Sequence, residues 1–147
     1  MKKIVLIILV LTILSCNTAK TIRTVNHSTL PAPIGPYSTS INYGDLIFVS
    51  GQIGIDPKST MLKDGLQEQT IQIFENLKII LKDNESDLNH ITKVTIFITD
   101  MQQFAVVNKI YAGYFQNHFP ARSTIQIAAL PKQAAIEIEC IAVKIRK

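Results

Sequence analysis

The chain has 147 residues, of which 47% are hydrophobic and 18% are charged. This length suits one domain and is short for two, and the composition is that of an ordinary globular protein. The formal net charge is +4, but Lys2 and Lys3 at the extreme N-terminus supply two of these charges. The surplus that remains is too small to indicate nucleic acid as a partner.

The first segment has the pattern of a secretory signal. The basic residues Lys2 and Lys3 precede an unbroken apolar run over residues 4–11. This run is too short to cross a bilayer, because a spanning helix needs about 20 apolar residues. The pattern therefore predicts an exported chain rather than one with a transmembrane helix in this segment.

The end of that segment resembles a bacterial lipobox, in which a cysteine is lipidated and becomes the first residue of the mature chain. The matching residues are Ile13-Leu14-Ser15-Cys16, and Leu14 is an unusual occupant of its position. The sequence predicts a signal peptide at 1–15, a lipid on Cys16, a tether at 16–20 and a domain at 21–147. The protein would then be anchored to a membrane of the bacterial cell envelope, on its periplasmic or surface side. The alternative is a plain signal peptide with a chance cysteine.

The chain contains two cysteines. A lipid on Cys16 leaves Cys140 alone, so the sequence predicts no intramolecular disulfide. Cys140 lies in an apolar strand pattern, which favours a buried, inert thiol. The histidines are His27, His90 and His118, and their wide spacing is not that of zinc ligands. We therefore expect no metal and satisfied or surface histidines.

The first half of the domain has the pattern of short strands and tight turns. Strands are predicted at residues 21–25, 38–43 and 46–50. Gly44-Asp45 supplies a hairpin turn between the second and third. The loop at residues 31–37 contains three prolines and is therefore stiff, so it would hold Tyr37 in one place.

A helix and a longer strand follow. Residues 66–81 place their apolar side chains on one face of a helix. Residues 90–99 alternate as a strand does, so that Val94, Ile96 and Ile98 share one face and Thr95, Phe97 and Thr99 share the other. The helix and this strand predict one apolar layer between them.

Asp100 can cap a second helix. Its apolar stripe is expected to contain Met101, Phe104, Ala105, Asn108, Tyr111, Ala112 and Phe115. Asn108 does not fit an apolar stripe, because an unpaired buried amide costs roughly 1–3 kcal/mol. It must therefore cap a strand edge or a neighbouring loop, or else make a polar contact in a site.

The residues that most suggest chemistry lie near the C-terminus, after Pro120. The pattern predicts a strand, a turn and a longer strand, at residues 123–127, 130–133 and 135–145. If the two strands pair as a hairpin, Arg122 can approach Glu137 or Glu139. A guanidinium and a carboxylate at one small cavity could hold an organic acid and a water. The alternative is a cross-strand ion pair on a solvated face.

The order of elements is strands, helix, strand, helix, strands. This order predicts an α+β domain in which two helices cover one face of a mixed sheet. The other face carries apolar side chains from Thr95, Phe97 and residues 141–145, and the sequence offers no third helix to cover it. An apolar patch of that extent predicts self-association.

Five blocks of sequence resemble the Rid/YjgF family. They occur in the family's order, which makes the match specific, and the resemblance covers residues 21–147. The blocks are Ala32-Pro33-Ile34-Gly35-Pro36-Tyr37-Ser38, Val49-Ser50-Gly51-Gln52-Ile53, Phe104-Ala105-Val106-Val107-Asn108-Lys109-Ile110-Tyr111, Phe119-Pro120-Ala121-Arg122-Ser123 and Ile136-Glu137-Ile138-Glu139.

The resemblance implies a chorismate-mutase-like α+β fold and a homotrimer with sites in the clefts between subunits. Many family members hydrolyse 2-imino acids to 2-keto acids and ammonia without a metal or cofactor. The implied roles are a carboxylate-binding arginine, Arg122, and a water-binding acid, Glu137. The implied pocket is lined by Tyr37, Gly51, Asn108 and the backbone of Thr124. Several members have cysteine in place of Thr124, a difference that backbone contacts should survive.

Three functions are compatible with this pattern. The first is a deaminase of reactive 2-imino or enamino acids, similar to 2-iminobutanoate/2-iminopropanoate deaminase, displayed on a membrane. The second is a non-catalytic lipoprotein that binds a small carboxylate or a partner protein through the same cleft. The third is hydrolysis of another substrate from the envelope. The presence of both Arg122 and Glu137 favours catalysis, because a binder needs the arginine but not the acid.

Overall fold

The computed structural model describes residues 21–25, 27–115 and 118–146, so the predicted signal peptide, Cys16 and most of the tether lie outside it. The elements are β1 (Ile22–Thr24), β2 (Ser40–Tyr43), β3 (Leu46–Ile53), α2 (Gly65–Asp83), η1 (Leu88–His90), β4 (Ile91–Ile98), η2 (Met101–Gln103), α3 (Phe104–Gly113), β5 (Ala121–Gln126), η3 (Pro131–Gln133) and β6 (Ile136–Val143). Within these residues no helix is both long and apolar enough to cross a membrane.

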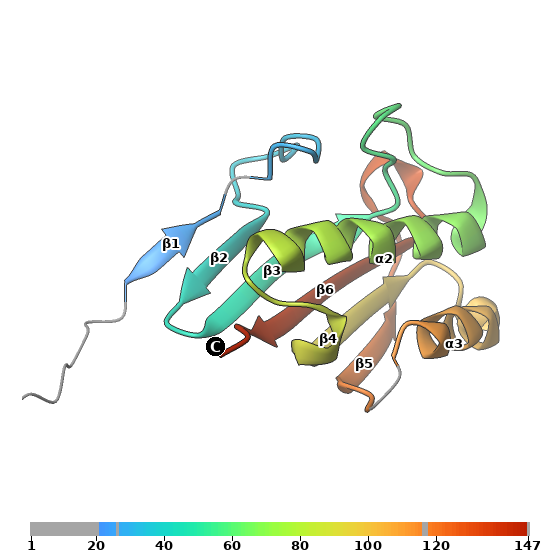
Figure 1. Ribbon diagram of the computed structural model, residues 1–147. Coiled ribbons are helices and arrows are strands. Elements are labelled where there is room, and N and C mark those ends of the chain that lie inside the picture. The colour runs from blue at the N-terminus through green and yellow to red at the C-terminus, as the bar shows by residue number, and fades with distance from the viewer. Residues whose placement is uncertain (1–20, 26, 116–117, 147) are drawn as a thin grey trace, which may run out of the picture.

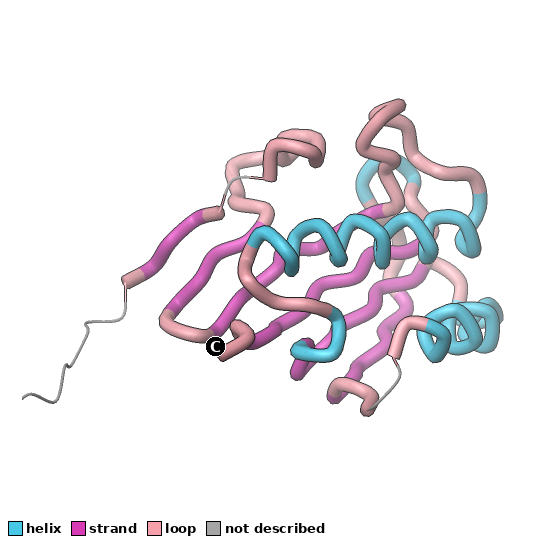
Figure 2. The backbone as a smooth tube through the Cα atoms, in the orientation of Figure 1, coloured by secondary structure: helices cyan, strands magenta, loops and turns pink. Residues whose placement is uncertain are grey.

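The strands of the described residues form one six-stranded mixed sheet in the order β1-β2-β3-β6-β4-β5 (Figure 1). The pair β4 and β5 is parallel, and the other neighbouring pairs are antiparallel. Both α2 and α3 lie on the same face of the sheet, as Figure 2 also shows. The predicted α+β architecture, with two helices on one face of a mixed sheet, is therefore confirmed.

The core lies between that face and the helices. Alternate residues of β4 and β6 point into it and are almost fully buried, namely Val94, Ile96, Ile98, Ile136, Ile138, Cys140 and Ala142. The apolar face of α2 supplies Ile73, Phe74, Leu77, Ile80 and Leu81. Burial of each large side chain stabilises the fold by about 1.5–3 kcal/mol. Cys140 is 4% exposed, so the predicted burial of its thiol is confirmed, and burial raises the pKa of the thiol to about 12.

The two helices contact each other through aromatic rings. The ring of Phe74 on α2 stacks on Tyr114 at 4.2 Å between centroids and meets Tyr111 edge-on at 5.8 Å. The expected stripe on the second helix is wrong in part. Its buried line runs through Val107, Tyr111 and Phe115, whereas the expected Met101, Phe104, Ala105 and Ala112 are exposed. Met101 lies outside α3, in the separate turn η2, and the buried residues follow a single line with a spacing of four residues.

The opposite face of the sheet has no helix over it in the described part of the chain. Its side chains include Thr95 and Phe97 of β4 and Glu137, Glu139 and Ile141 of β6, all of them half-buried. A broad hollow of about 590 Å³ opens on this face, lined by residues of β2, β3, β4 and β6. The uncovered face that the sequence predicted is therefore present.

The expected hairpin between the last two strands is wrong. β4 lies between β5 and β6, and it pairs with β5 in parallel and with β6 in antiparallel fashion. Residues 127–135, which include η3, carry the chain past β4 to the far side, and along the way Ile127 N–H donates to the Ile98 carbonyl. Arg122 and Glu137 are consequently not cross-strand neighbours.

Candidate functional site

Arg122 lies on the helix side of β5, at the edge of the sheet. Its Nη2 donates a hydrogen bond of 2.7 Å to Oδ1 of Asn108 on α3. Its guanidinium lies over the ring of Tyr111 at 4.6 Å from the centroid and 5.6 Å from that of Phe104. Asn108 therefore makes a polar contact with a candidate site residue, one of the two alternatives that the sequence left open.

These contacts fix the guanidinium before any ligand binds. A cation over an aromatic face is stabilised by about 0.5–2 kcal/mol, and burial raises the pKa of Tyr111 to about 12, so its ring stays neutral. Among the described residues, no carboxylate forms a salt bridge with Arg122. The alternative of an Arg122–Glu ion pair within one chain is thus wrong. The bond to Asn108 uses one of five N–H donors, which leaves others to grip a carboxylate.

Thr124 lies two residues after Arg122 on the same face of β5 and pairs with Ile96 of β4. Its buried hydroxyl has no hydrogen-bond partner among the described residues. We call Arg122, Asn108 and Thr124 the cationic half-site. Tyr111 and Phe104, for which the sequence predicted no role in a site, place their rings against the guanidinium of this half-site. The sequence alone could not predict these contacts of the arginine with the aromatic rings, because they depend on how α3 packs beside β5.

Glu137 lies on the uncovered face of the sheet, between Phe97 of β4 and Ile53 of β3. Burial raises the pKa of its carboxyl, and the negative charge of Glu139 on the same face raises it further. A carboxyl with a raised pKa is better suited to exchange protons near neutral pH.

Gly51 makes room for that carboxyl. β3 has a bulge between Val49 and Gln52, and Gly51 lies within it, beyond the predicted end of the strand at residue 50. A Cβ on Gly51 would overlap the carboxylate of Glu137 and lie only 2.6 Å from its Cδ. Only glycine fits here without moving Glu137, so the backbone of the bulge and the carboxylate share one small space.

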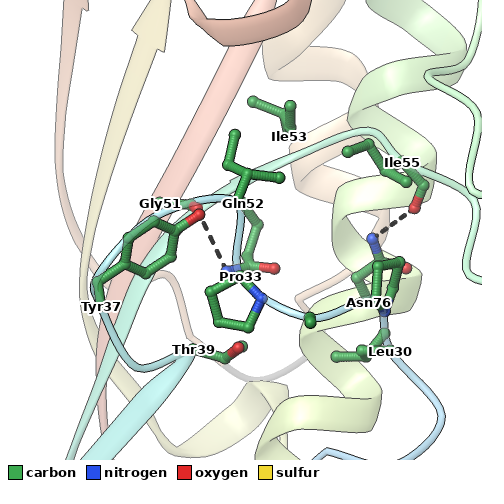
Figure 3. A pocket seen from close by; sticks show the side chains of 12 residues that line it. Leu30, Pro33, Tyr37, Thr39, Gly51, Gln52, Ile53, Ile55 and Asn76 are labelled. Carbon is green, nitrogen blue, oxygen red and sulfur yellow. Dashed lines mark hydrogen bonds between the residues drawn. The ribbon is translucent and has the colours of Figure 1, made fainter.

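Tyr37 and Gly51 line one cavity of about 70 Å³, together with Pro33, Gln52 and other residues (Figure 3). Tyr37 comes from the proline-rich loop, and its side chain is 47% exposed at the rim. The side-chain amide of Gln52 donates to the Gly51 carbonyl at 3.3 Å and so steadies the bulge. We call Glu137, Gly51 and Tyr37 the acidic half-site.

The two half-sites lie on opposite faces of the sheet. Arg122 pairs with Val94, whereas Glu137 pairs with Phe97, three residues further along β4. Because side chains alternate between faces along a strand, an odd separation places the two on opposite sides. The structure therefore brings Arg122 to Asn108 and Gly51 to both Glu137 and the cavity of Tyr37, but one chain alone does not join Arg122 to Glu137.

Comparison with known proteins identifies the family. A family model described as Endoribonuclease L-PSP matches residues 27–144, most of the chain. The chain belongs to the Rid/YjgF (L-PSP) family. It is 42% identical over 123 residues to mouse 2-iminobutanoate/2-iminopropanoate deaminase, covering 83% of this chain and 91% of the mouse protein. It is also 46% identical over 115 residues to a RutC family protein of Pyrococcus horikoshii, covering 78% and 91%.

Solved structures of Rid-family proteins share this fold. RidA of the Antarctic bacterium Psychrobacter superposes with a TM-score of 0.80 at 36% identity, covering 82% of this chain and 98% of that one. E. coli TdcF, solved with bound serine, also has a TM-score of 0.80 at 36% identity, covering 84% and 99%. The mixed sheet with two helices on one face is thus the fold of the Rid family.

Proposed function

We propose that this Rid-family chain hydrolyses 2-imino acids to 2-keto acids and ammonia. The mammalian relatives named 2-iminobutanoate/2-iminopropanoate deaminase, at 41–44% identity, support this substrate class. The serine bound to TdcF supports a ligand that carries a nitrogen next to a carboxylate. Within the chain, the Arg122 guanidinium is held by Asn108, and burial together with the charge of Glu139 raises the pKa of the Glu137 carboxyl, which supports its use as a proton acceptor and donor.

The site would be assembled between subunits of a homotrimer. The observation that carries this proposal is that the cationic and acidic half-sites occupy opposite faces of one sheet. β5 is an edge strand, so the rim of the cationic half-site can meet a neighbouring subunit. The uncovered face offers that neighbour a hollow of about 590 Å³ lined in part by Glu139, which lies on the same face of β6 as Glu137. Arg122 of one subunit would then face Glu137 of the next.

The proposed reaction mainly requires that the imino acid and a water molecule are held in the correct positions. Arg122 would hold the substrate carboxylate through two parallel N–H bonds. Glu137 would take a proton from water as the oxygen adds to the protonated C=N carbon, which gives a carbinolamine. It would then return that proton to nitrogen. As the C–N bond breaks, Glu137 would take the proton of the carbinolamine hydroxyl, which leaves the 2-keto acid and ammonia, and the ammonia would take up that proton as ammonium. One water is consumed for each ammonia released. The proposed reaction uses no metal, because the bound substrate and the water are held next to each other by side chains.

The direct test feeds the purified domain, residues 16–147, with the imine that an amino-acid oxidase generates from its substrate. The expected result is faster release of 2-keto acid than in buffer alone, because the enzyme removes the delay of spontaneous hydrolysis. The matched control is the same domain with Arg122→Ala. No acceleration by the unaltered domain would favour the second function, a binder of small carboxylates or of a partner protein.

We also propose that the chain is a lipoprotein of the bacterial envelope. The support is the basic start, the apolar run at residues 4–11 and the cysteine at position 16. In cells that process lipoproteins, Cys16→Ser should move the protein from the membrane fraction to the soluble fraction, because the acyl chains hold it there. Cys140→Ser is the matched control and should leave it in the membrane. A Cys16→Ser variant that stays in the membrane would contradict the lipid anchor.

A further inference from the structure

His27 is buried between two separate parts of the chain. Its side chain is 3% exposed, with Nδ1 2.9 Å from Oδ2 of Asp83 at the end of α2 and Nε2 2.9 Å from Oγ of Ser40 on β2. A carboxylate can only accept, so Nδ1 is the donor to Asp83. In the neutral imidazole, Nε2 then accepts from the Ser40 hydroxyl. We call His27, Ser40 and Asp83 the His27 clasp.

The clasp is tied to the C-terminal turn of α2. The side-chain amide of Asn84 donates to Ser40 Oγ at 3.0 Å and to the Ile80 carbonyl at 2.7 Å. Asp83 lies at the negative end of the helix dipole, where a carboxylate is unfavourable without a donor, and His27 supplies one. Ser40 and Asn84 are each 1% exposed. Removal of the imidazole would therefore leave the buried Ser40 hydroxyl proton without its acceptor and the Asp83 carboxylate without its donor.

A serine, a histidine and an aspartate in this order also form the catalytic triad of serine hydrolases. The Ser40 hydroxyl is buried beneath α2 and already accepts a bond from Asn84. It cannot reach a substrate carbonyl, so the arrangement is not that of a nucleophile. The role of the cluster is therefore structural, because it joins His27 to β2 and to the end of α2.

The clasp fixes one end of the proline-rich loop. At the other end, Ser50 of β3 makes two hydrogen bonds. Its hydroxyl donates to the Ser38 carbonyl at 2.8 Å, and its backbone N–H donates to the Thr39 carbonyl at 3.0 Å. The hydrogen bonds described for residues 28–37 are local to the loop and its anchor, from Leu30 N–H to the His27 carbonyl and from Tyr37 N–H to the Gly35 carbonyl. The loop thus bridges two anchors.

We infer that His27 is a positioning residue whose two side-chain bonds set where residues 28–37 lie, and with them Tyr37. β1, just before His27, is a three-residue exposed edge strand and holds this part of the chain only weakly. The walls of two cavities, of about 70 and 430 Å³, include Leu30, Pro33 and Tyr37 from this loop. The consequence for catalysis rests on the proposed function, but the placement of the loop does not.

Hydrogen exchange of the unaltered full domain and of His27→Ala measures the inference without any substrate. The Leu30 and Tyr37 amides, which are the hydrogen-bonded amides described in the loop, should exchange about tenfold faster or more in the variant, because the two side-chain bonds that hold the start of the loop are lost. Amides of α3 and β5 should be unchanged. His90→Ala is the matched control, since His90 forms an exposed pair with Asp87 at 2.7 Å and should leave the loop unchanged.

Two further variants separate positioning from folding. His27→Gln keeps an amide near the place of Nε2 and should restore part of the protection, and Ser40→Ala removes one bond and should give an intermediate effect. If imine hydrolysis is found, His27→Ala should raise KM more than it lowers kcat. Unchanged exchange of the Leu30 and Tyr37 amides, or faster exchange spread evenly over the chain, would overturn the inference. Absence of imine hydrolysis would contradict the proposed function but would not affect the inference that His27 positions the loop.

Discussion

Arg122→Ala should lower kcat/KM for 2-imino acids by about a thousandfold while the assembly stays intact. The guanidinium is expected to hold the substrate carboxylate by paired, charge-assisted bonds, whose loss costs about 3–5 kcal/mol. The side chain contacts Asn108 and the rings of Tyr111 and Phe104, but it is not part of the fully buried core. Steady-state kinetics with size-exclusion chromatography measures both expectations.

Arg122→Lys is the informative companion to that variant. Lysine keeps the positive charge but cannot present two parallel N–H bonds or stack on Tyr111 as a plane. We expect it to recover only a small part of the activity. An Arg122→Ala variant with near-normal turnover would show that the carboxylate is held by another group. A variant that fails to assemble would show that Arg122 serves the subunit interface rather than substrate binding.

Glu137→Gln should abolish proton transfer while substrate binding persists. We expect kcat to fall by about a hundredfold or more and the affinity for a 2-keto acid to change little, because an amide can orient water but cannot take its proton. Gly51→Ala should have a similar effect by a different route, since the new Cβ would displace the Glu137 carboxylate. Isothermal titration and kinetics on both variants check this.

Stability supplies an independent control for Glu137→Gln. The folded state raises the pKa of Glu137, so it disfavours the ionised carboxyl, and the glutamate costs stability once the pH is above its unfolded value. At pH 7 the glutamine variant should therefore melt at the same temperature or higher, and the difference should shrink as the pH falls towards the ordinary glutamate pKa of 4.5 and be lost below it. A variant that melts well below the unaltered domain at pH 7 would contradict the assigned environment.

The layers of the fold could be predicted from the sequence because they depend on local periodicity. Residues 66–81 place apolar side chains on one helical face, and α2 spans Gly65–Asp83. The alternation in residues 90–99 assigned the buried face of β4 without error. Asn108 was recognised as needing a partner, since a lone amide on an apolar stripe is costly whatever the fold.

The placement of the site residues could not be predicted in the same way. Alternation assigns faces within a strand, but it does not say which strand is the neighbour or whether the pair is parallel. β5 and β6 are consecutive and joined through a turn, which favours a hairpin, yet β4 lies between them. His27 gave no pattern at all, because Ser40 and Asp83 are 13 and 56 residues away in the chain.

The central claim is that Arg122 and Glu137 act together only across two subunits. The most direct measurement combines Arg122→Ala and Glu137→Gln subunits under different affinity tags and purifies the mixed trimers. Each mixed trimer would contain one junction with both residues intact, so about a third of the unaltered activity should return although each parent is inactive. Mixed trimers as inactive as their parents would contradict the shared site, and with it the account of how this fold performs catalysis.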